Sequence, residues 1–122
     1  MSITEANSET ILLHNPRCSK SRALKVLLDE RGVSYQERRY LEEPLSRAEL
    51  DVVHKALGRP VGEWTRSREA AFAEAGLEPG ASEDELLGAM VAHPVLMERP
   101  ILLRAGVAKV GRPPEDALSV VD

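Results

Sequence analysis

The sequence has little of what several classes of protein require. It holds one cysteine, Cys18, so no disulfide can form within the chain, and this usage is typical of a reducing cytoplasm. No apolar run approaches the ~20 residues that a membrane-spanning helix needs. Aromatic residues make up only 3% of the chain and the formal net charge is −4, which disfavours base-stacking platforms and generally basic nucleic-acid-binding domains. We therefore expect neither nucleic acid nor a membrane as a partner.

Patterns for metal and phosphate binding are missing as well. One cysteine and three scattered histidines do not give the spacing of metal ligands, and there is no glycine-rich phosphate loop. We expect no metal and no bound cofactor. Residues 1–10, MSITEANSET, are polar and acidic and lack the apolar segment of a signal peptide, so they predict a flexible N-terminal tail.

Residues 11–122 are long enough for one domain with a real core, and 43% hydrophobic with 30% charged residues is typical of a soluble globular protein. Residues 10–13, a threonine followed by three apolar residues, predict a short buried strand. Helical periodicity begins at Ser19 and ends at Gly32, and residues 33–40 predict a second strand. Because a helix connects these two strands, we expect them to be parallel.

The middle of the chain, at about residues 46–93, predicts a helical insertion. Ser46 with Glu49 and Ser82 with Glu85 are capping-box signatures, each followed by apolar residues at helical spacing. Between these two helices, residues 63–75 predict one or two shorter ones. The insertion therefore separates two parts of the chain that are richer in strands.

The last part predicts a hairpin and a final helix. Residues 101–103 and 107–110 are strand-like and are separated by a turn containing glycine, and the prolines after Gly111 suit the start of a helix. The element order is βαβ, helical insert, ββα. This order predicts an α/β fold with a four-stranded mixed sheet flanked by helices.

The residues that carry chemistry gather around Cys18, in the stretch HNPRCSKSR. The cysteine lies where a strand ends and a helix begins, and a helix N-terminus favours a thiolate over a thiol. Arg17, Lys20, Arg22 and a protonated His14 would act in the same direction, and such a turn also suits an anion. A buried structural cysteine is the alternative, but it would gain nothing from a basic turn. The pattern favours a reactive thiolate that meets an oxyanion.

Three arginines stand out by their context. Arg99 precedes Pro100 at the head of a strand, and Arg112 lies in GRPPE at a strand-to-helix turn. Rigid turns of this kind would hold both guanidinium groups for bidentate oxyanion binding. Arg66, with Arg68 close by in EWTRSRE, has weaker support from the residues alone. A single arginine is more often a solvated side chain beside a carboxylate.

Four separated motifs, HNPRCSKSR, YLEEPLSRAEL, HPVLMERPILL and VGRPPE, occur in the order and spacing of the ArsC arsenate reductase family. The chain resembles that family from about Ile11 to its C-terminus. The resemblance implies a thioredoxin-like fold with a helical insertion, which agrees with the element order above. It also implies a cis-proline before the third strand, at Arg99–Pro100.

The resemblance further implies a role for each motif residue. The family's nucleophile falls on Cys18, the histidine that favours the thiolate falls on His14, and the serine that can hydrogen-bond the sulfur falls on Ser21. The arginines that bind the oxyanion fall on Arg66, Arg99 and Arg112. Arg68 is an alternative to Arg66, because the family pattern is looser there.

These roles predict an arsenate reductase that reduces arsenate to arsenite through a covalent arsenate adduct of Cys18. Because the chain has no second thiol, the electrons must come from an external one, and we expect glutathione as co-substrate with glutaredoxin as partner. Arsenic detoxification in the cytoplasm would be the setting.

An ArsC-like oxidoreductase acting on another substrate, such as a glutathionylated protein, is one alternative, since the variant RCSKS departs from the best-characterised reductases. A non-catalytic regulator that binds a large protein, as the related Spx proteins do, is another, although Ser21 replaces the second cysteine of their CxxC switch.

Overall fold

A computed structural model describes residues 3–4 and 8–122 of the chain. The strands are β1 (Ile11–Leu13), β2 (Gln36–Arg38), β3 (Ile101–Arg104) and β4 (Val107–Val110). The α-helices are α1 (Ser19–Glu30), α2 (Arg47–Leu57), α3 (Ala70–Glu74) and α4 (Glu83–Ala92). Three 3-10 helices complete the set: η1 (Val61–Trp64), η2 (Pro94–Leu96) and η3 (Pro114–Val120). Within the described residues, no helix is both long and apolar enough to cross a bilayer.

The strands form one mixed sheet in the order β2-β1-β3-β4. β1 runs parallel to β2 and antiparallel to β3, and β3 runs antiparallel to β4. The predicted four-stranded mixed sheet of an α/β fold is thus confirmed. The parallel pair follows from the α1 crossover, and the β3–β4 pair follows from the short hairpin at residues 105–106.

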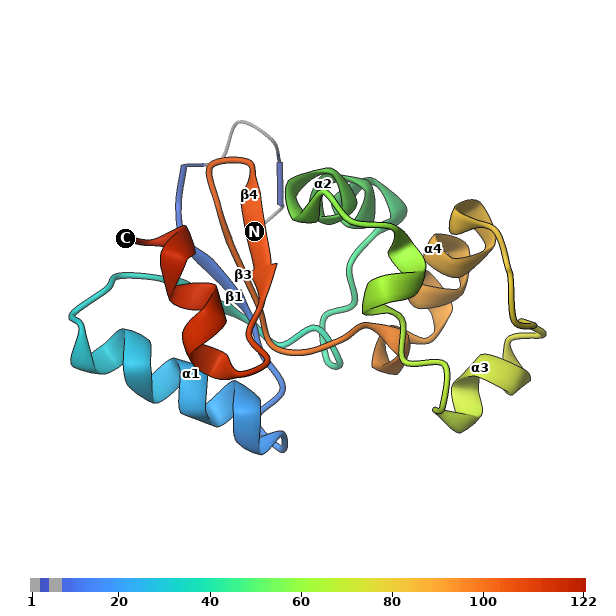
Figure 1. The fold of residues 1–122 in the computed structure, drawn as a ribbon, viewed down its shortest axis with the longest axis horizontal. Coiled ribbons are helices and arrows are strands. Elements are labelled where there is room, and N and C mark those ends of the chain that lie inside the picture. Colours follow the sequence, from blue (N-terminus) through green and yellow to red (C-terminus); the bar gives the residue numbers. More distant parts are fainter. Residues whose placement is uncertain (1–2, 5–7) are drawn as a thin grey trace.

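Helices cover both faces of the sheet, and strand alternation decides which side chains meet them. On one face, Leu12 packs with Leu24 of α1 and Leu118 of η3 in a small core. On the other face, Ile11 and Leu13 belong to a larger core that extends into α2 and the insertion. Figure 1 shows α1 and the C-terminal helix on one side of the sheet and α2, α3 and α4 on the other.

Both predicted capping boxes are present. The side chain of Ser46 accepts a hydrogen bond from the backbone of Glu49 at the start of α2, and Ser82 does the same with Glu85 at the start of α4. Gly58 ends α2 in the left-handed region, with φ of 63°. The capping chemistry therefore fixes the start of α2 and α4 and the end of α2 within the insertion.

Several expectations differ from the structure. β2 has only three residues, because it pairs with the three-residue β1. The C-terminal helix is a 3-10 helix rather than an α-helix. Of the predicted flexible tail, residues 1–2 and 5–7 lie outside the described residues. Ile3 is 2% exposed and its backbone N–H donates to Glu49 Oε2 at 2.9 Å, so this part of the segment packs against the core.

Candidate active site

Cys18 lies at the turn between β1 and α1 and is the N-cap residue of the helix. Its backbone is extended, with φ of −95° and ψ of 124°, and its carbonyl accepts the N–H of Arg22 at 3.0 Å, the first turn of the helix. Its own N–H donates to the carbonyl of Asn15 at 3.0 Å, which closes the turn. The half-buried sulfur therefore faces the free N–H groups at the start of α1.

The surroundings favour the thiolate. Burial raises the pKa of the Cys18 thiol, but the backbone N–H groups of Ser21 and Lys20 and the guanidinium of Arg99 lower it, and the net pKa lies below its ordinary value. A lowered pKa increases the fraction of thiolate at neutral pH. The predicted reactive turn thus has a physical basis in this structure, although its helix supplies backbone donors more than basic side chains.

Arg99 is the arginine that lies beside the sulfur. Its side chain is half-buried, and its Nε and Nη1 atoms are buried without a hydrogen-bond partner among the described residues. Buried donors of this kind nearly always find a partner, and the cost of leaving a charged one unsatisfied is high. This guanidinium has two free donors and lies next to a sulfur whose surroundings favour the thiolate. It is therefore suited to binding an oxyanion.

The peptide bond that follows this arginine, Arg99–Pro100, is cis, in agreement with the expectation for Pro100. The Arg112–Pro113 bond is also cis. Nothing in the sequence pattern predicts the second one. Pro100 itself is buried at the head of β3, and its carbonyl accepts the N–H of Gly111 at 2.8 Å.

Arg66 and Arg112 are brought together by a carboxylate. Glu98 Oε1 lies 3.3 Å from Arg66 Nε, and its Oε2 lies 3.5 Å from Arg112 Nε. Arg66 also pairs with Glu69 at 2.8 Å, and Arg112 donates from Nη1 to the carbonyl of Arg99 at 3.0 Å. All three predicted arginines therefore lie at or beside one segment, residues 98–99, although they come from the insertion, the segment before β3 and the turn after β4.

A cavity of about 500 Å³ opens beside this group and is lined in part by Arg66, Arg68, Glu98 and Arg112. Arg66 is half-buried and paired with Glu98, whereas Arg68 is exposed. Arg66 is thus the arginine of the insertion that contacts this cluster. Sequence reasoning missed Glu98, and the available signal was its place directly before Arg99 between two apolar segments.

The side chains of His14 and Ser21 hydrogen-bond to each other and stabilise the turn, rather than contacting the sulfur. His14 is 2% exposed, and its Nδ1 lies 2.7 Å from Ser21 Oγ, which also accepts the N–H of Asn15 at 3.0 Å. Burial lowers the pKa of His14, so its ring is neutral at neutral pH. The expectation of a protonated His14 is therefore wrong. Ser21 reaches the sulfur through its backbone N–H, since its hydroxyl is used by His14 and Asn15.

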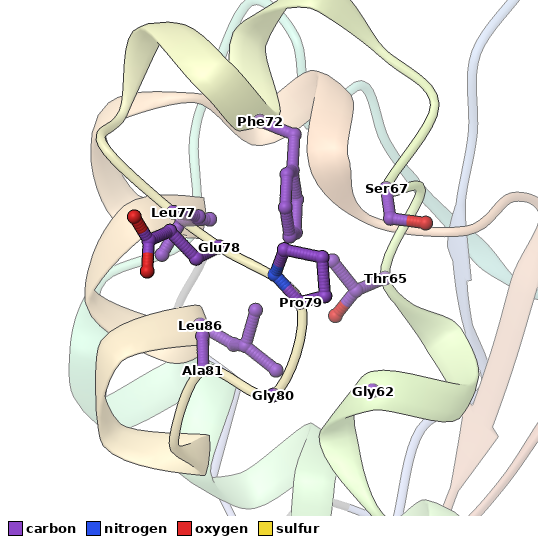
Figure 2. A pocket seen from close by; sticks show the side chains of 10 residues that line it. All are labelled: Gly62, Thr65, Ser67, Phe72, Leu77, Glu78, Pro79, Gly80, Ala81 and Leu86. Carbon is purple, nitrogen blue, oxygen red and sulfur yellow. The ribbon is translucent and has the colours of Figure 1, made fainter.

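The insertion contains a second cavity, of about 520 Å³, in which Phe72, Pro79 and Leu86 face one another (Figure 2). None of the predicted site residues lines it. Among residues 3–4 and 8–122, no cluster of three or more histidine, cysteine, aspartate or glutamate side chains could hold a metal ion.

Comparison with known proteins agrees with the motifs. A model of the ArsC family matches residues 13–120. An arsenate reductase from Neisseria meningitidis serogroup B is 42% identical over 115 residues, covering 93% of this chain and 98% of the relative. The uncharacterized protein YfgD of Escherichia coli K12 is 45% identical over 112 residues, covering 90% of this chain and 94% of the relative.

A solved structure of an arsenate reductase from Vibrio cholerae matches with a TM-score of 0.86 and 39% sequence identity, covering 93% of this chain and 98% of the other. The helical insertion is included in this match, and the thioredoxin-like fold expected from the motifs is confirmed. With the family model spanning almost all of residues 11–122, the chain belongs to the ArsC family.

Proposed function

We propose that this protein is an arsenate reductase in which Cys18 is the nucleophile and Arg99, Arg112 and Arg66 bind the arsenate oxyanion. The observation that carries the proposal is the pairing of a thiol of lowered pKa with the buried, unpartnered Nε and Nη1 donors of Arg99. Relatives named arsenate reductase, at 36–42% identity, support arsenate as the oxyanion.

The first step is attack by the Cys18 thiolate on the arsenic atom of arsenate. A sulfur–arsenic bond forms, one arsenate oxygen leaves as water after taking up protons, and arsenic remains As(V). Negative charge on the arsenate oxygens is stabilised by fixed cations and by the N–H groups at the start of α1. In this proposal Arg99, which lowers the pKa of the Cys18 thiol, acts on the reacting group, and Arg66 and Arg112, which line a neighbouring cavity, bind the incoming oxyanion.

The second step is reduction by an external thiol, for which we propose glutathione. Its sulfur attacks Cys18 Sγ, and the sulfur–arsenic bond breaks with its electron pair remaining on arsenic. Arsenic is reduced to As(III) and leaves as arsenite, while the two sulfurs are oxidised to a mixed disulfide. A further thiol, supplied by glutaredoxin with glutathione, returns Cys18 to the thiolate. The absence of any other cysteine in the chain requires such an external donor.

The test is arsenite formation by the purified protein with arsenate, glutathione and glutaredoxin. We expect turnover well above the background of the same mixture without the protein, and none with Cys18→Ser, because a hydroxyl is a far weaker nucleophile at neutral pH and cannot form the mixed disulfide. Activity with glutathione alone would remove glutaredoxin from the proposal. No turnover with either donor would favour an ArsC-like oxidoreductase of another substrate or a protein-binding role.

A further inference from the structure

Tyr40 is a buried tyrosine whose hydroxyl has no hydrogen-bond partner in the described part of the chain. It follows β2 after one intervening residue, is 1% exposed, and packs its ring in the larger core with Leu13 and Leu45. Its hydroxyl oxygen is buried and makes no hydrogen bond within the described residues. Buried tyrosine hydroxyls usually find a partner. Packing alone would be served equally well by phenylalanine, so the hydroxyl needs another explanation.

The groups around this hydroxyl are those of the candidate site. Burial raises the pKa of Tyr40 far above its ordinary value, Arg99 opposes the rise, and Cys18 and Glu98 add to it. The side chain of Asn15 is also close, although it makes no hydrogen bond of normal geometry with the hydroxyl. The hydroxyl is therefore a neutral donor that keeps its proton over the whole pH range in which a thiolate reacts.

Two sets of unpartnered donors thus lie at the same end of the sheet. Leu13, the last residue of β1 before the Cys18 turn, pairs with Arg38 of β2 and with Ile101 of β3, so Tyr40 and Arg99 flank the start of that turn from either side. Among the described residues, Arg99 offers Nε and Nη1 and Tyr40 offers its hydroxyl. A tetrahedral oxyanion has several oxygens that each accept hydrogen bonds, and a bidentate contact from Arg99 engages two of them. We propose that the Tyr40 hydroxyl donates a hydrogen bond to an oxygen of the tetrahedral oxyanion that Arg99 holds against Cys18. This inference rests on the proposed function for the identity of the anion only.

The experiment compares Tyr40→Phe with Tyr35→Phe. The second variant is a matched control, because Tyr35 is the only other tyrosine and its hydroxyl donates to Asp29 Oδ1 at 2.8 Å, away from the site residues. The measurement is protection of Cys18 from iodoacetamide by arsenate, without glutathione. Loss of one hydrogen bond to a charged ligand corresponds to a factor of about ten or more in affinity. We expect the half-protecting arsenate concentration to rise about tenfold in Tyr40→Phe and to stay unchanged in Tyr35→Phe.

A second measurement does not depend on the folding of Tyr40→Phe. In the Tyr35→Phe chain Tyr40 is the single tyrosine, so with tyrosine labelled by 13C at Cζ it gives a single NMR resonance next to its hydroxyl. Addition of arsenate should shift that resonance with the same concentration dependence as the protection of Cys18. Absence of a shift while arsenate protects Cys18 would overturn the inference.

The outcomes separate this inference from the proposed function. Tyr40→Phe that folds normally, alkylates normally and is protected like the wild type refutes the Tyr40 inference, whether or not the wild type forms arsenite. Weakened protection in Tyr40→Phe supports it even if arsenite never forms, in which case only the proposed reaction fails. If arsenate gives the wild type no protection, there is no oxyanion site and both proposals fail.

Discussion

At the scale of single residues, Cys18 and Arg99 depend on each other. The guanidinium lowers the pKa of the thiol against the opposing effect of burial, and a thiolate in turn gives a negative neighbour to an arginine with two unpartnered nitrogens. Neither side chain has this property alone.

The first prediction concerns the pKa of Cys18. Iodoacetamide alkylation should have a midpoint below the free-cysteine value of about 8.5, and Arg99→Ala should raise it. Because the folded pKa lies below the unfolded one, the thiolate contributes stability above the unfolded pKa, and that contribution is lost as the pH falls through the folded value. The measurement is the alkylation rate against pH, with the exposed Arg104→Ala as control. A midpoint at or above 8.5 would contradict the thiolate.

His14→Ala tests the corrected role of the histidine in the same assay. A neutral ring that holds Ser21 does not attract the thiolate by charge, so the midpoint should change only through loosening of the turn. We expect the melting temperature to fall clearly, while the midpoint of Cys18 alkylation changes little. A rise of the midpoint by about one unit with unchanged stability would show that the ring is charged after all.

The second prediction separates the arginines by steady-state arsenite formation. Arg99→Ala and Arg112→Ala should each lower kcat/KM by about ten- to a hundredfold, the equivalent of about 1.5–3 kcal/mol per lost charge-assisted contact. Arg99→Lys should recover only part of the loss, since an ammonium cannot copy the planar fork. Arg66→Ala should be impaired, while the exposed Arg68→Ala serves as the matched control and should resemble the wild type. Equal losses at 66 and 68 would refute this assignment.

How far these residues could be predicted depends on the range of the interaction. The effect of a helix N-terminus on Cys18 is local, so the sequence pattern was sufficient to predict it. The neutrality of His14 results from tertiary burial, and the position of Glu98 and Tyr40 depends on β3 and the end of β2 lying beside β1. No periodicity or motif contains that information.

At the scale of elements, Glu49 connects three parts of the chain at the start of α2. Its carboxylate accepts the N–H of Ser46 at 3.0 Å and of Ile3 at 2.9 Å, and it pairs with Arg38 of β2 at 2.9 Å. Burial raises the pKa of Glu49, but the Arg38 guanidinium and these backbone donors outweigh it and hold the pKa at about 2. One capping residue therefore links β2, α2 and the N-terminal segment.

The third prediction is that Glu49→Gln destabilises the protein by about 3 kcal/mol at pH 7, from a pKa held at about 2 against 4.5. Because the folded pKa is depressed, this stability is fully present above pH 4.5 and is lost as the pH falls toward 2. The difference between variant and wild type in urea unfolding should therefore shrink between pH 6 and pH 3. Glu85→Gln, which changes the exposed capping box of α4, is the control and should cost no more than about 1 kcal/mol. Equal costs at both positions would contradict the buried network.

The limits of a helix were predictable wherever a capping residue sets them locally. Ser46, Ser82 and Gly58 act on their own neighbours in the chain, so both capping boxes and the end of α2 were predictable. β2 was predicted too long, because its length is set by pairing with the three-residue β1. The buried position of Ile3 was missed for a similar reason, since its partner Glu49 lies 46 residues away.

At the scale of the whole molecule, the insertion and the sheet share one core. The larger cluster joins Ile11, Leu13 and Ile101 of the sheet with Trp64 and Met90 of the insertion. The site also draws on both parts, since Arg66 comes from the insertion and Cys18 from the turn between β1 and α1. We therefore propose that residues 11–122 form a single cooperative domain.

The fourth prediction tests this unity by equilibrium unfolding in urea. Trp64 is the only tryptophan, is 0% exposed and reports the insertion, while far-UV circular dichroism reports the whole chain. Both signals should give one transition with the same midpoint, as expected for two-state unfolding. The titration is best done in Cys18→Ser, which cannot oxidise. A fluorescence midpoint at clearly lower urea would mean that the insertion unfolds separately.

The order β2-β1-β3-β4 makes β2 and β4 the edge strands, or borders, of the sheet, and edge strands are where another copy of the chain could add a strand. β2 consists of Gln36, Glu37 and Arg38, so one border is short and has no apolar side chain. On the other border, β4 is four residues long and carries the exposed Lys109. Short, charged borders are poor templates for a strand from another copy. At high concentration the folded protein should thus resist fibril-like growth through either edge strand.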